Sequence, residues 1–377
     1  MKKIFAKNWK PLQSQIQSAI LGLWFIFTVL LLLVSCTAAP GGASAQNSDP
    51  IPVLAYYYIW FDTTSWERAK IDYPVLGHYS SDNAEVMRQH IKWAKTAGIN
   101  GFIVSWKSTD RLNRRLEQLI EIADQENFKL AIIYQGLDFH REPLPITQVE
   151  ADFSYFMDHF AEHPAFDLYE RPMVIWSGTW RFSREEVESV IQDKRDHLLI
   201  LASERNVEGY QNLADLVDGN AYYWSSVNPD TFPGYKEKLA AMGAAVHANG
   251  GLWIAPAAAG FDARLIGGTT VVERKDGETL QIQFNVAMQS TPDAIGLISW
   301  NEFSENSHIE PSEKYDQRYL EVLADIRHAK VVTIGDFDSS DPGDTINSLG
   351  TSRVAALGLV GALIILSVVM IFRRAVR

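Results

Sequence analysis

The segment from Val53 to Asp62, VLAYYYIWFD, decides between the two folds that this sequence could adopt. It begins a series of short apolar runs rich in β-branched and aromatic residues, a pattern typical of strands buried on both faces of a parallel sheet. An open, doubly wound sheet usually has a glycine-rich phosphate turn directly after its first strand. This segment contains no glycine. We therefore favour a closed barrel and keep the open sheet as the alternative.

Seven further runs of the same kind follow along the chain. The eight runs lie at residues 53–60, 101–106, 129–135, 173–176, 197–203, 216–224, 251–256 and 294–300. Helical patterns lie between the first three, at 83–97 and 112–126, where apolar residues recur at three- and four-residue steps. Apolar strands that alternate with amphipathic helices predict a parallel sheet covered by helices. Eight such strands in about 280 residues match an α/β fold of the (β/α)8 TIM barrel type in number and size.

Charge is unevenly distributed along the 377 residues. Lys and Arg number 34 against 46 Asp and Glu, which gives a net charge of −12. Eight of the basic residues lie near the two ends of the chain, and no acid precedes Asp49 or follows Asp344. The middle therefore holds 26 basic and 46 acidic residues, which gives it a net charge of −20. A domain this acidic repels a phosphate backbone, so we expect no nucleic-acid partner. The single cysteine, Cys36, lies outside the middle and leaves the predicted barrel without a disulfide.

Residues 1–36 are typical of an export signal. Four lysines precede the 16-residue apolar run AILGLWFIFTVLLLLV at 19–34, which is shorter than the roughly 20 residues needed to span a bilayer. The run leads into LVSC, which resembles a bacterial lipoprotein lipobox, so Cys36 is the predicted lipidation site. The alternative is an uncleaved N-terminal anchor in which Cys36 has no role. Residues 37–50 form the linker that follows.

A second apolar segment lies near the C-terminus. Residues 354–372 are uncharged and long enough to form a transmembrane helix. The basic tail at 373–377 predicts a cytoplasmic C-terminus by the positive-inside rule. A polar stalk at 331–353 separates this helix from the domain at 51–330. The sequence thus predicts a protein of the cell membrane whose main domain is extracellular.

Aromatic and polar side chains gather at the C-terminal ends of the predicted strands, which form the active-site face of a TIM barrel. Sugar rings stack on aromatic side chains while their hydroxyls bond to amides and carboxylates, so we expect a carbohydrate site here. The expected sugar-binding residues are Tyr57, Trp60, Trp106, Tyr134, Gln135, Trp176, Tyr222, Tyr223, Trp224, Trp300, Asn301 and His308. For any one aromatic residue, the alternative is that it packs at the end of the core.

Two glutamates follow the eighth predicted strand, in the segment WNEFSENSHIEP at 300–311. Glu302 and Glu305 are three residues apart, so one turn can bring both carboxyl groups to the same side. Cleavage of a glycosidic bond needs one carboxyl group as acid and a second as base or nucleophile, held at different pKa values. Glutamates at this spacing more often form a solvated helix face. Their place after a strand that ends in tryptophan favours a catalytic pair.

This segment resembles the signature of glycoside hydrolase family 99, in which the eighth strand runs into a W/F-N-E-W-x-E-G-T-x-I-E-P pattern. Further agreement lies in AYYYIWF of the first strand, YPVLGHYSSDN before the first helix, AGINGFIVSW of the second strand and IAPAAAGFDAR of the seventh. The resemblance covers most of residues 51–325. It implies a retaining, endo-acting α-mannosidase-type hydrolase on a (β/α)8 barrel without a cofactor.

The resemblance also implies roles for individual residues. Glu302 matches the glutamate that acts as a base on the substrate 2-hydroxyl and gives a 1,2-anhydro-sugar intermediate. Glu305 matches the general acid that later acts as a base. In that family a tyrosine supports the first glutamate. The matching residue in this sequence is Tyr223 or, as the second choice, Tyr222.

Several positions depart from the family pattern. Phe303 replaces the usual tryptophan, and Lys107 and Gln135 stand where a tryptophan and a glutamate are common. The letters SENSHI also resemble the α-1,3-glucanases of family 71. Two alternatives therefore remain, an α-1,3-glucanase and a barrel that binds glycans or assists polysaccharide assembly without catalysis.

The remaining motifs point to no other chemistry. The histidines show no metal-ligand spacing, and we expect those outside the motif, such as His90, on helix faces or in loops. No HExxH, GxSxG or phosphate-binding loop is present in the sequence. We therefore predict no metal and no cofactor.

Overall fold

The structure is a computed structural model that describes residues 50–68 and 70–328. Several predicted segments lie outside the described residues: the signal or anchor at 1–36 with Cys36, nearly all of the linker, the stalk at 331–353, the transmembrane helix at 354–372 and the tail at 373–377. No helix within the described part is long and apolar enough to cross a membrane.

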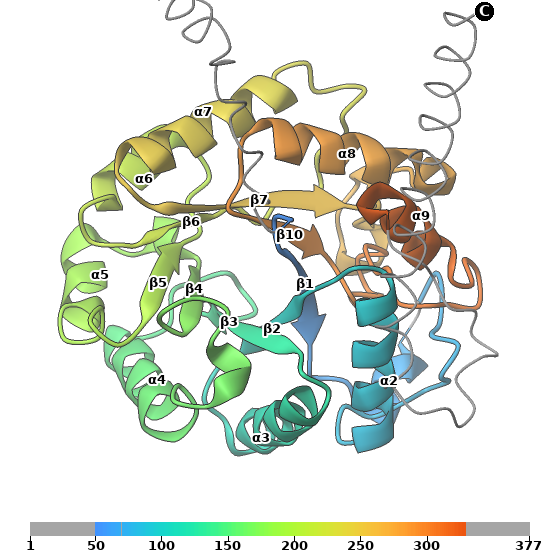
Figure 1. The fold of residues 1–377 in the computed structure, drawn as a ribbon, viewed down its shortest axis with the longest axis horizontal. Coiled ribbons are helices and arrows are strands. Elements are labelled where there is room, and N and C mark those ends of the chain that lie inside the picture. The colour runs from blue at the N-terminus through green and yellow to red at the C-terminus, as the bar shows by residue number, and fades with distance from the viewer. Residues whose placement is uncertain (1–49, 69, 329–377) are drawn as a thin grey trace, which may run out of the picture. The chain divides into compact units, whose positions relative to one another are not determined.

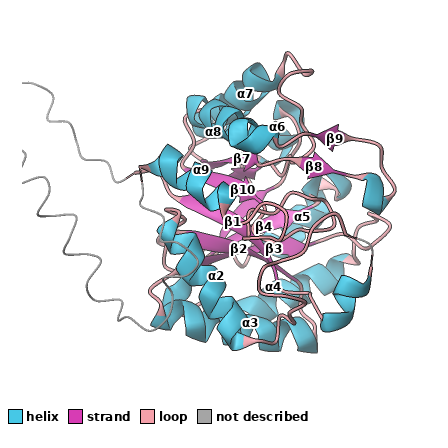
Figure 2. Ribbon diagram, turned by 90° about the vertical axis from the view of Figure 1, so that its right-hand side faces the viewer, coloured by secondary structure: helices cyan, strands magenta, loops and turns pink. Residues whose placement is uncertain are grey.

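Eight parallel strands close into a barrel (Figures 1 and 2). They are β1 (Val53–Tyr58), β2 (Gly101–Trp106), β3 (Lys129–Gln135), β4 (Met173–Ser177), β5 (Leu199–Ala202), β6 (Gly219–Ala221), β7 (Leu252–Ala258) and β10 (Ala294–Ile298). Strand β10 pairs with both β7 and β1, with Val53 opposite Ile295. This last pairing closes the sheet, so the predicted (β/α)8 barrel is confirmed and the open sheet is wrong.

Helices surround the barrel (Figure 1). They are α2 (Ala84–Thr96), α3 (Asp110–Gln125), α4 (Ile146–His159), α5 (Arg184–Ile191), α6 (Val207–Leu213), α7 (Tyr235–Ala248), α8 (Glu278–Gln289) and α9 (Arg318–Arg327). Short 3-10 helices lie in the loops: η1 (Thr63–Glu67), η2 (Pro164–Phe166), η3 (Thr179–Arg181), η4 (Arg264–Ile266) and η5 (Lys275–Gly277). The two helices predicted from periodicity are α2 and α3. They begin after Asn83 and Thr109, whose side chains accept hydrogen bonds from backbone N–H groups of the first turn.

Alternate residues of each strand point to opposite sides and build two layers of core. In β1, Ala55 and Tyr57 pack with buried residues of the helices, so their layer lies between the barrel and the helices. Leu54, Tyr56 and Tyr58 pack with residues from the other strands inside the barrel. We call the C-terminal ends of the strands, with the loops that follow them, the mouth of the barrel. The alternation decides which side chains at the strand ends reach this mouth.

The sixth strand is much shorter than the predicted run at 216–224, because only Gly219–Ala221 pairs with its neighbours. Gly219 lies very close to β7, and a Cβ atom added to it would be 2.1 Å from the carbonyl oxygen of Leu252. After β7 the chain forms a small antiparallel hairpin of β8 (Phe261–Asp262) and β9 (Val271–Val272).

We expect Gly219→Ala to weaken the barrel between β6 and β7. The added methyl group collides with backbone, which cannot move aside as a side chain would, so the free energy of unfolding should fall by about 2 kcal/mol or more. Gly234→Ala is the matched control, because its φ is −86° and the nearest atom to an added Cβ is 3.8 Å away. Urea denaturation measures both variants. Equal stability of the two would contradict the close approach at Gly219.

Candidate active site

The turn after β10 carries both candidate catalytic glutamates. The backbone N–H of Glu302 donates to Ser299 Oγ at 2.8 Å, and the backbone N–H of Ser304 donates to Glu302 Oε1 at 2.9 Å. The carbonyl oxygen of Glu302 accepts a hydrogen bond from the Ser307 N–H at 3.2 Å. Glu302 is thus fixed and buried, whereas Glu305, on the same turn, is half-buried.

Asn301 connects this turn to β1. Its Oδ1 accepts a hydrogen bond from the Tyr58 N–H at 2.8 Å, and its Nδ2 donates to the Tyr58 carbonyl oxygen at 3.0 Å. The side-chain amide therefore continues the pairing of β1 with β10 beyond the end of β10. Asn301 is completely buried, so its side chain has no free face for a sugar. It positions its neighbours instead.

Tyr58 is a mouth residue that the sequence patterns did not single out. Its hydroxyl lies 2.7 Å from the hydroxyl of Tyr223, and its ring centroid lies 4.4 Å from that of Trp60, which is 42% exposed. Burial raises the pKa of both tyrosines well above the ordinary value, and the charges of Glu302 and Glu305 raise it further. Both phenols therefore stay protonated and can donate hydrogen bonds. The alternation along β1 was the available signal, because Tyr58 shares its side with Trp60.

The two carboxyl groups have different surroundings. Burial, followed by the neighbouring charge of Glu305, raises the pKa of Glu302 to about 8, although Ser304 and Lys70 oppose this shift. Burial also raises the pKa of Glu305, and the charge of Arg141 opposes that shift. The deeper carboxyl group therefore holds a proton at neutral pH in the free protein. Two carboxyl groups with shifted pKa values on one turn suit acid–base chemistry.

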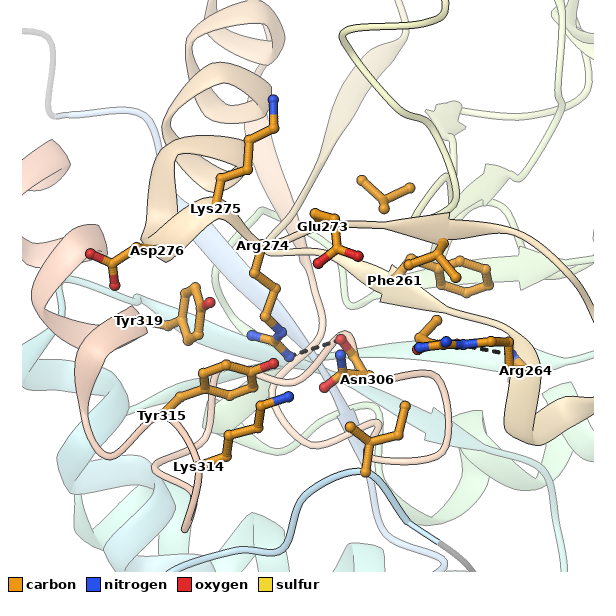
Figure 3. Close-up of a pocket in the computed structure, with 14 residues that line it drawn as sticks. Phe261, Arg264, Glu273, Arg274, Lys275, Asp276, Asn306, Lys314, Tyr315 and Tyr319 are labelled. Atoms are coloured by element: carbon orange, nitrogen blue, oxygen red, sulfur yellow. Dashed lines mark hydrogen bonds and ion pairs between the residues drawn. The ribbon is translucent and has the colours of Figure 1, made fainter.

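Arg274 supports the rear of the turn (Figure 3). Its buried guanidinium lies 4.5 and 4.4 Å from the ring centroids of Tyr315 and Tyr319, and it donates to the carbonyl oxygens of Asn306 and His308 at 2.8 and 2.7 Å. A cavity of about 370 Å³ adjoins these residues and the β8–β9 hairpin. The hairpin also contacts the turn directly, because the backbone N–H of Asp262 donates to the carbonyl oxygen of Glu305 at 2.7 Å. The backbone around Glu305 is therefore held from two sides.

His308 belongs to this support. Its ring stacks on Phe303 with 3.9 Å between centroids, and its Nε2 lies 3.1 Å from Asp72 Oδ2. Burial, and then the charge of Arg274, lowers the pKa of His308 to about 3, so the ring is neutral and donates its Nε2 proton to Asp72. The side chain is fully buried and presents no surface to a sugar.

Five of the expected sugar-binding aromatic residues point away from the mouth. Tyr57 bonds to His90, Trp106 to Asn113 and Tyr134 to Asp152. The five residues pack in the layer between barrel and helices and are at most 2% exposed: Tyr57, Trp106, Tyr134, Trp176 and Trp300. Strand alternation is the physical reason for the four that lie in β1 to β4, because neighbouring residues of a strand face opposite sides. Trp300 lies beyond the end of β10 and packs against His90 and Phe102. We therefore leave these five, Asn301 and His308 out of the proposed sugar contacts.

The other expected contacts remain near the mouth. Gln135 is half-buried and donates from Nε2 to Ser105 Oγ at 2.9 Å, which turns it toward the barrel interior. Tyr222 and Trp224 stack on each other in the loop after β6, with 5.1 Å between centroids. Over the part of the chain that the structure describes, no three His, Asp or Glu side chains converge as metal ligands.

Comparison with known proteins identifies the family, because the sequence model of glycosyl hydrolase family 99 matches residues 62–330. The chain belongs to glycosyl hydrolase family 99. Among curated relatives of this family 99 protein, the "Glycoprotein endo-alpha-1,2-mannosidase" of Rattus norvegicus is 23% identical over 339 residues, which cover 73% of this chain and 72% of the relative. The Mus musculus protein of the same description is 22% identical over 344 residues, with the same coverage.

A solved structure has the same fold. The GH99 endo-alpha-mannosidase from Bacteroides thetaiotaomicron, in complex with bis-tris-propane, superposes with a TM-score of 0.66 at 20% identity over 74% of this chain and 97% of that one. The resemblance inferred from the sequence motifs is thereby confirmed at the level of family and fold. This family 99 chain is a glycoside hydrolase.

We expect the raised pKa of Glu302 to appear as a pH dependence of stability. Between about pH 5 and pH 8 the folded protein keeps a proton that the unfolded chain, with the ordinary value of 4.5, has released. The free energy of unfolding contributed by this group therefore falls as pH rises through that interval. The glutamine in the Glu302→Gln variant cannot ionise. The free energy of unfolding of this variant, relative to that of the unsubstituted protein, should therefore increase by about 1 to 3 kcal/mol from pH 5 to pH 8.

Denaturant titrations at several pH values measure this difference. Glu121→Gln, at an exposed position on α3, is the matched control and should show no such trend. A stability difference for Glu302→Gln that stays constant with pH would contradict the raised pKa.

Proposed function

We propose that this glycoside hydrolase is a retaining, endo-acting enzyme that cleaves α-mannoside-type linkages in a polysaccharide or glycan, with Glu302 and Glu305 as its catalytic pair. The observation that carries the proposal is the single turn after β10, which holds one buried and one half-buried carboxyl group beside Tyr58 and Tyr223. The description of the curated relatives as endo-alpha-1,2-mannosidases supports the class of substrate.

In the proposed first step, Glu302 in its ionised form removes the proton of the substrate 2-hydroxyl while that oxygen attacks the anomeric carbon. The bond from this carbon to the leaving oxygen breaks, and Glu305 gives the leaving oxygen its proton. A 1,2-anhydro sugar is formed. In the second step Glu305 takes a proton from water, the water oxygen opens the ring at the anomeric carbon, and Glu302 returns its proton to O2. Two displacements at one carbon leave its configuration unchanged.

The surroundings of the pair suit these roles. A carboxylate whose conjugate acid has a pKa of about 8 is a stronger base than an ordinary glutamate, so it is better able to remove a hydroxyl proton once ionised. The phenols of Tyr58 and Tyr223 supply donors beside the carboxylates. Trp60 offers an exposed ring on which a sugar face can stack.

We expect Glu302→Gln and Glu305→Gln each to lower the rate of oligosaccharide release from α-mannan by roughly 100- to 10,000-fold, because each removes one proton-transfer group. The measurement is chromatography of the released oligosaccharides, with α-1,3-glucan as a parallel substrate. Glu121→Gln should retain full activity. Unchanged rates in both active-site variants would contradict the catalytic pair. Release from α-1,3-glucan alone would favour the glucanase alternative, and binding without release would favour a glycan-binding protein.

We also propose that the barrel is tethered to the outer face of the cell membrane. The proposal rests on the sequence of the two ends, with four lysines before the apolar run at 19–34 and the basic tail after the apolar run at 354–372. Both ends then face the cytoplasm if neither is cleaved. If Cys36 is lipidated, the lipid replaces the apolar run at 19–34 as the N-terminal anchor, and the apolar run at 354–372 remains as the C-terminal anchor.

Protease added to intact cells tests this topology. Once the outer layers are permeable, digestion should remove residues 50–335 and leave a small C-terminal fragment in the membrane, because that fragment is shielded by the bilayer. Immunoblots against the barrel and against a C-terminal tag follow the two parts, and a cytoplasmic protein serves as control. Full protection of the barrel under these conditions would mean that it lies inside the cell.

A further inference from the structure

Two cations, Arg205 and Lys238, lie close to aromatic rings at one side of the barrel mouth. The guanidinium carbon of Arg205, just after β5, lies 4.0 Å from the ring centroid of Trp180. The ammonium of Lys238, in the first turn of α7, lies 5.1 and 4.6 Å from the ring centroids of Tyr222 and Trp224, and it donates to the Tyr222 hydroxyl at 3.2 Å. Cation–π contacts thus orient both charges. We call Arg205 and Lys238 the basic rim.

Neither Arg205 nor Lys238 forms an ion pair with any of residues 50–68 and 70–328, although acids outnumber bases by 46 to 34 along the chain. Asp230 lies in the same loop as Trp224 but pairs with Lys275. Glu204 precedes Arg205 directly and lies within reach of its charge, but it is buried, and a Cβ atom added to Gly209 on α6 would be 2.5 Å from its Oε2. Burial raises the pKa of Glu204 above its ordinary value, which weakens it as a counter-charge.

Holding two cations together without a counter-charge costs free energy. Burial, and then the charge of Arg205, lowers the pKa of Lys238, as expected for two like charges on the same side of the mouth. An anion bound beside both charges reduces this cost. A guanidinium presents a planar fork of donors that matches the two oxygens of a carboxylate or phosphate, and an ammonium adds a point charge.

We propose that the basic rim binds a negatively charged substituent, a carboxylate or a phosphate, on the glycan that the neighbouring active site cleaves. This inference rests on the proposed hydrolase function. Arg205 follows the C-terminal end of β5, and Tyr222, which contacts Lys238, follows the C-terminal end of β6, so the basic rim lies on the same face of the barrel as the glutamate turn after β10. A chain that is cut internally extends beyond the catalytic pair and can reach this rim with a neighbouring sugar unit.

The test compares the full-length protein with the double variant Arg205→Gln/Lys238→Gln. The substrates are α-mannooligosaccharides of equal length that are neutral, carry one uronate, or carry one phosphate. We expect the unsubstituted protein to cleave at least one anionic substrate with a kcat/KM about tenfold above the neutral one, a difference worth about 1.4 kcal/mol. Added salt should reduce this preference because it screens the charges. The double variant should lose the preference and keep its activity on the neutral substrate.

Arg114→Gln/Lys236→Gln is the matched control. It removes the same charge from exposed positions on α3 and α7, and it should keep the preference. The proposal is overturned if the unsubstituted protein shows no preference for either anionic substrate, or if the preference persists in the rim variant. It is also overturned if the rim variant differs only in binding to vesicles of anionic lipid.

Binding measurements separate this proposal from the hydrolase proposal. Calorimetry with Glu305→Gln, with and without the rim substitutions, gives the affinity for the same three oligosaccharides in the absence of turnover. Rim-dependent affinity for the anionic sugars together with no hydrolysis of any substrate would support the basic rim and contradict the hydrolase function. Hydrolysis without any effect of substrate charge would support the hydrolase function and contradict the basic rim.

Discussion

The two hydrogen bonds between the Asn301 amide and the backbone of Tyr58 are the contact on which the candidate active site depends. They extend the closure of the barrel from β10 to the turn that carries the glutamates. One residue further along the chain lies Glu302, and on the other side of the contact the phenol of Tyr58 reaches Tyr223. In a buried site an unpaired amide is costly, so these bonds have one favoured geometry. A single side chain thereby sets the relative positions of a carboxyl group and a hydrogen-bond donor.

Most of the WNEFSENSHIEP segment serves to hold this geometry and does not face the mouth. The Glu310 carboxylate accepts a hydrogen bond from the Tyr79 hydroxyl at 2.8 Å and lies 3.0 Å from His90 Nε2, which ties the segment to α2. On the opposite side, Arg274 holds the carbonyl oxygens that follow Glu305. The segment is therefore fixed by polar contacts to distant parts of the chain, and only the two glutamates offer carboxyl groups for chemistry. This arrangement explains how a turn without regular secondary structure can keep two carboxyl groups in place.

The sequence predicted the barrel and the glutamate turn because both depend on local pattern. Buried strands appear as apolar runs, and glutamates after the last strand lie at the mouth of any TIM barrel. The sugar contacts were predicted less well, because every aromatic residue at a strand end was expected at the mouth, whichever side of the strand it occupies. Alternation along the strands sends Trp106 and Trp176 outward and leaves Tyr58 inside the barrel. The supports were not predictable from spacing. His90 lies on a helix, as expected, but on the buried face of α2 against Glu310, 220 residues away, and no local pattern marks such a contact.

The central claim is that the turn after β10 cleaves an α-linked glycan by two successive displacements at the anomeric carbon. The stereochemistry of the first product tests it most directly. Proton NMR of an α-mannooligosaccharide digest in its first minutes, before the free sugar equilibrates, shows which anomer the enzyme releases. The account predicts that the α-anomer appears first and that the β-anomer grows only later by mutarotation. Initial release of the β-anomer would mean a single displacement by water and would contradict the proposed roles of Glu302 and Glu305.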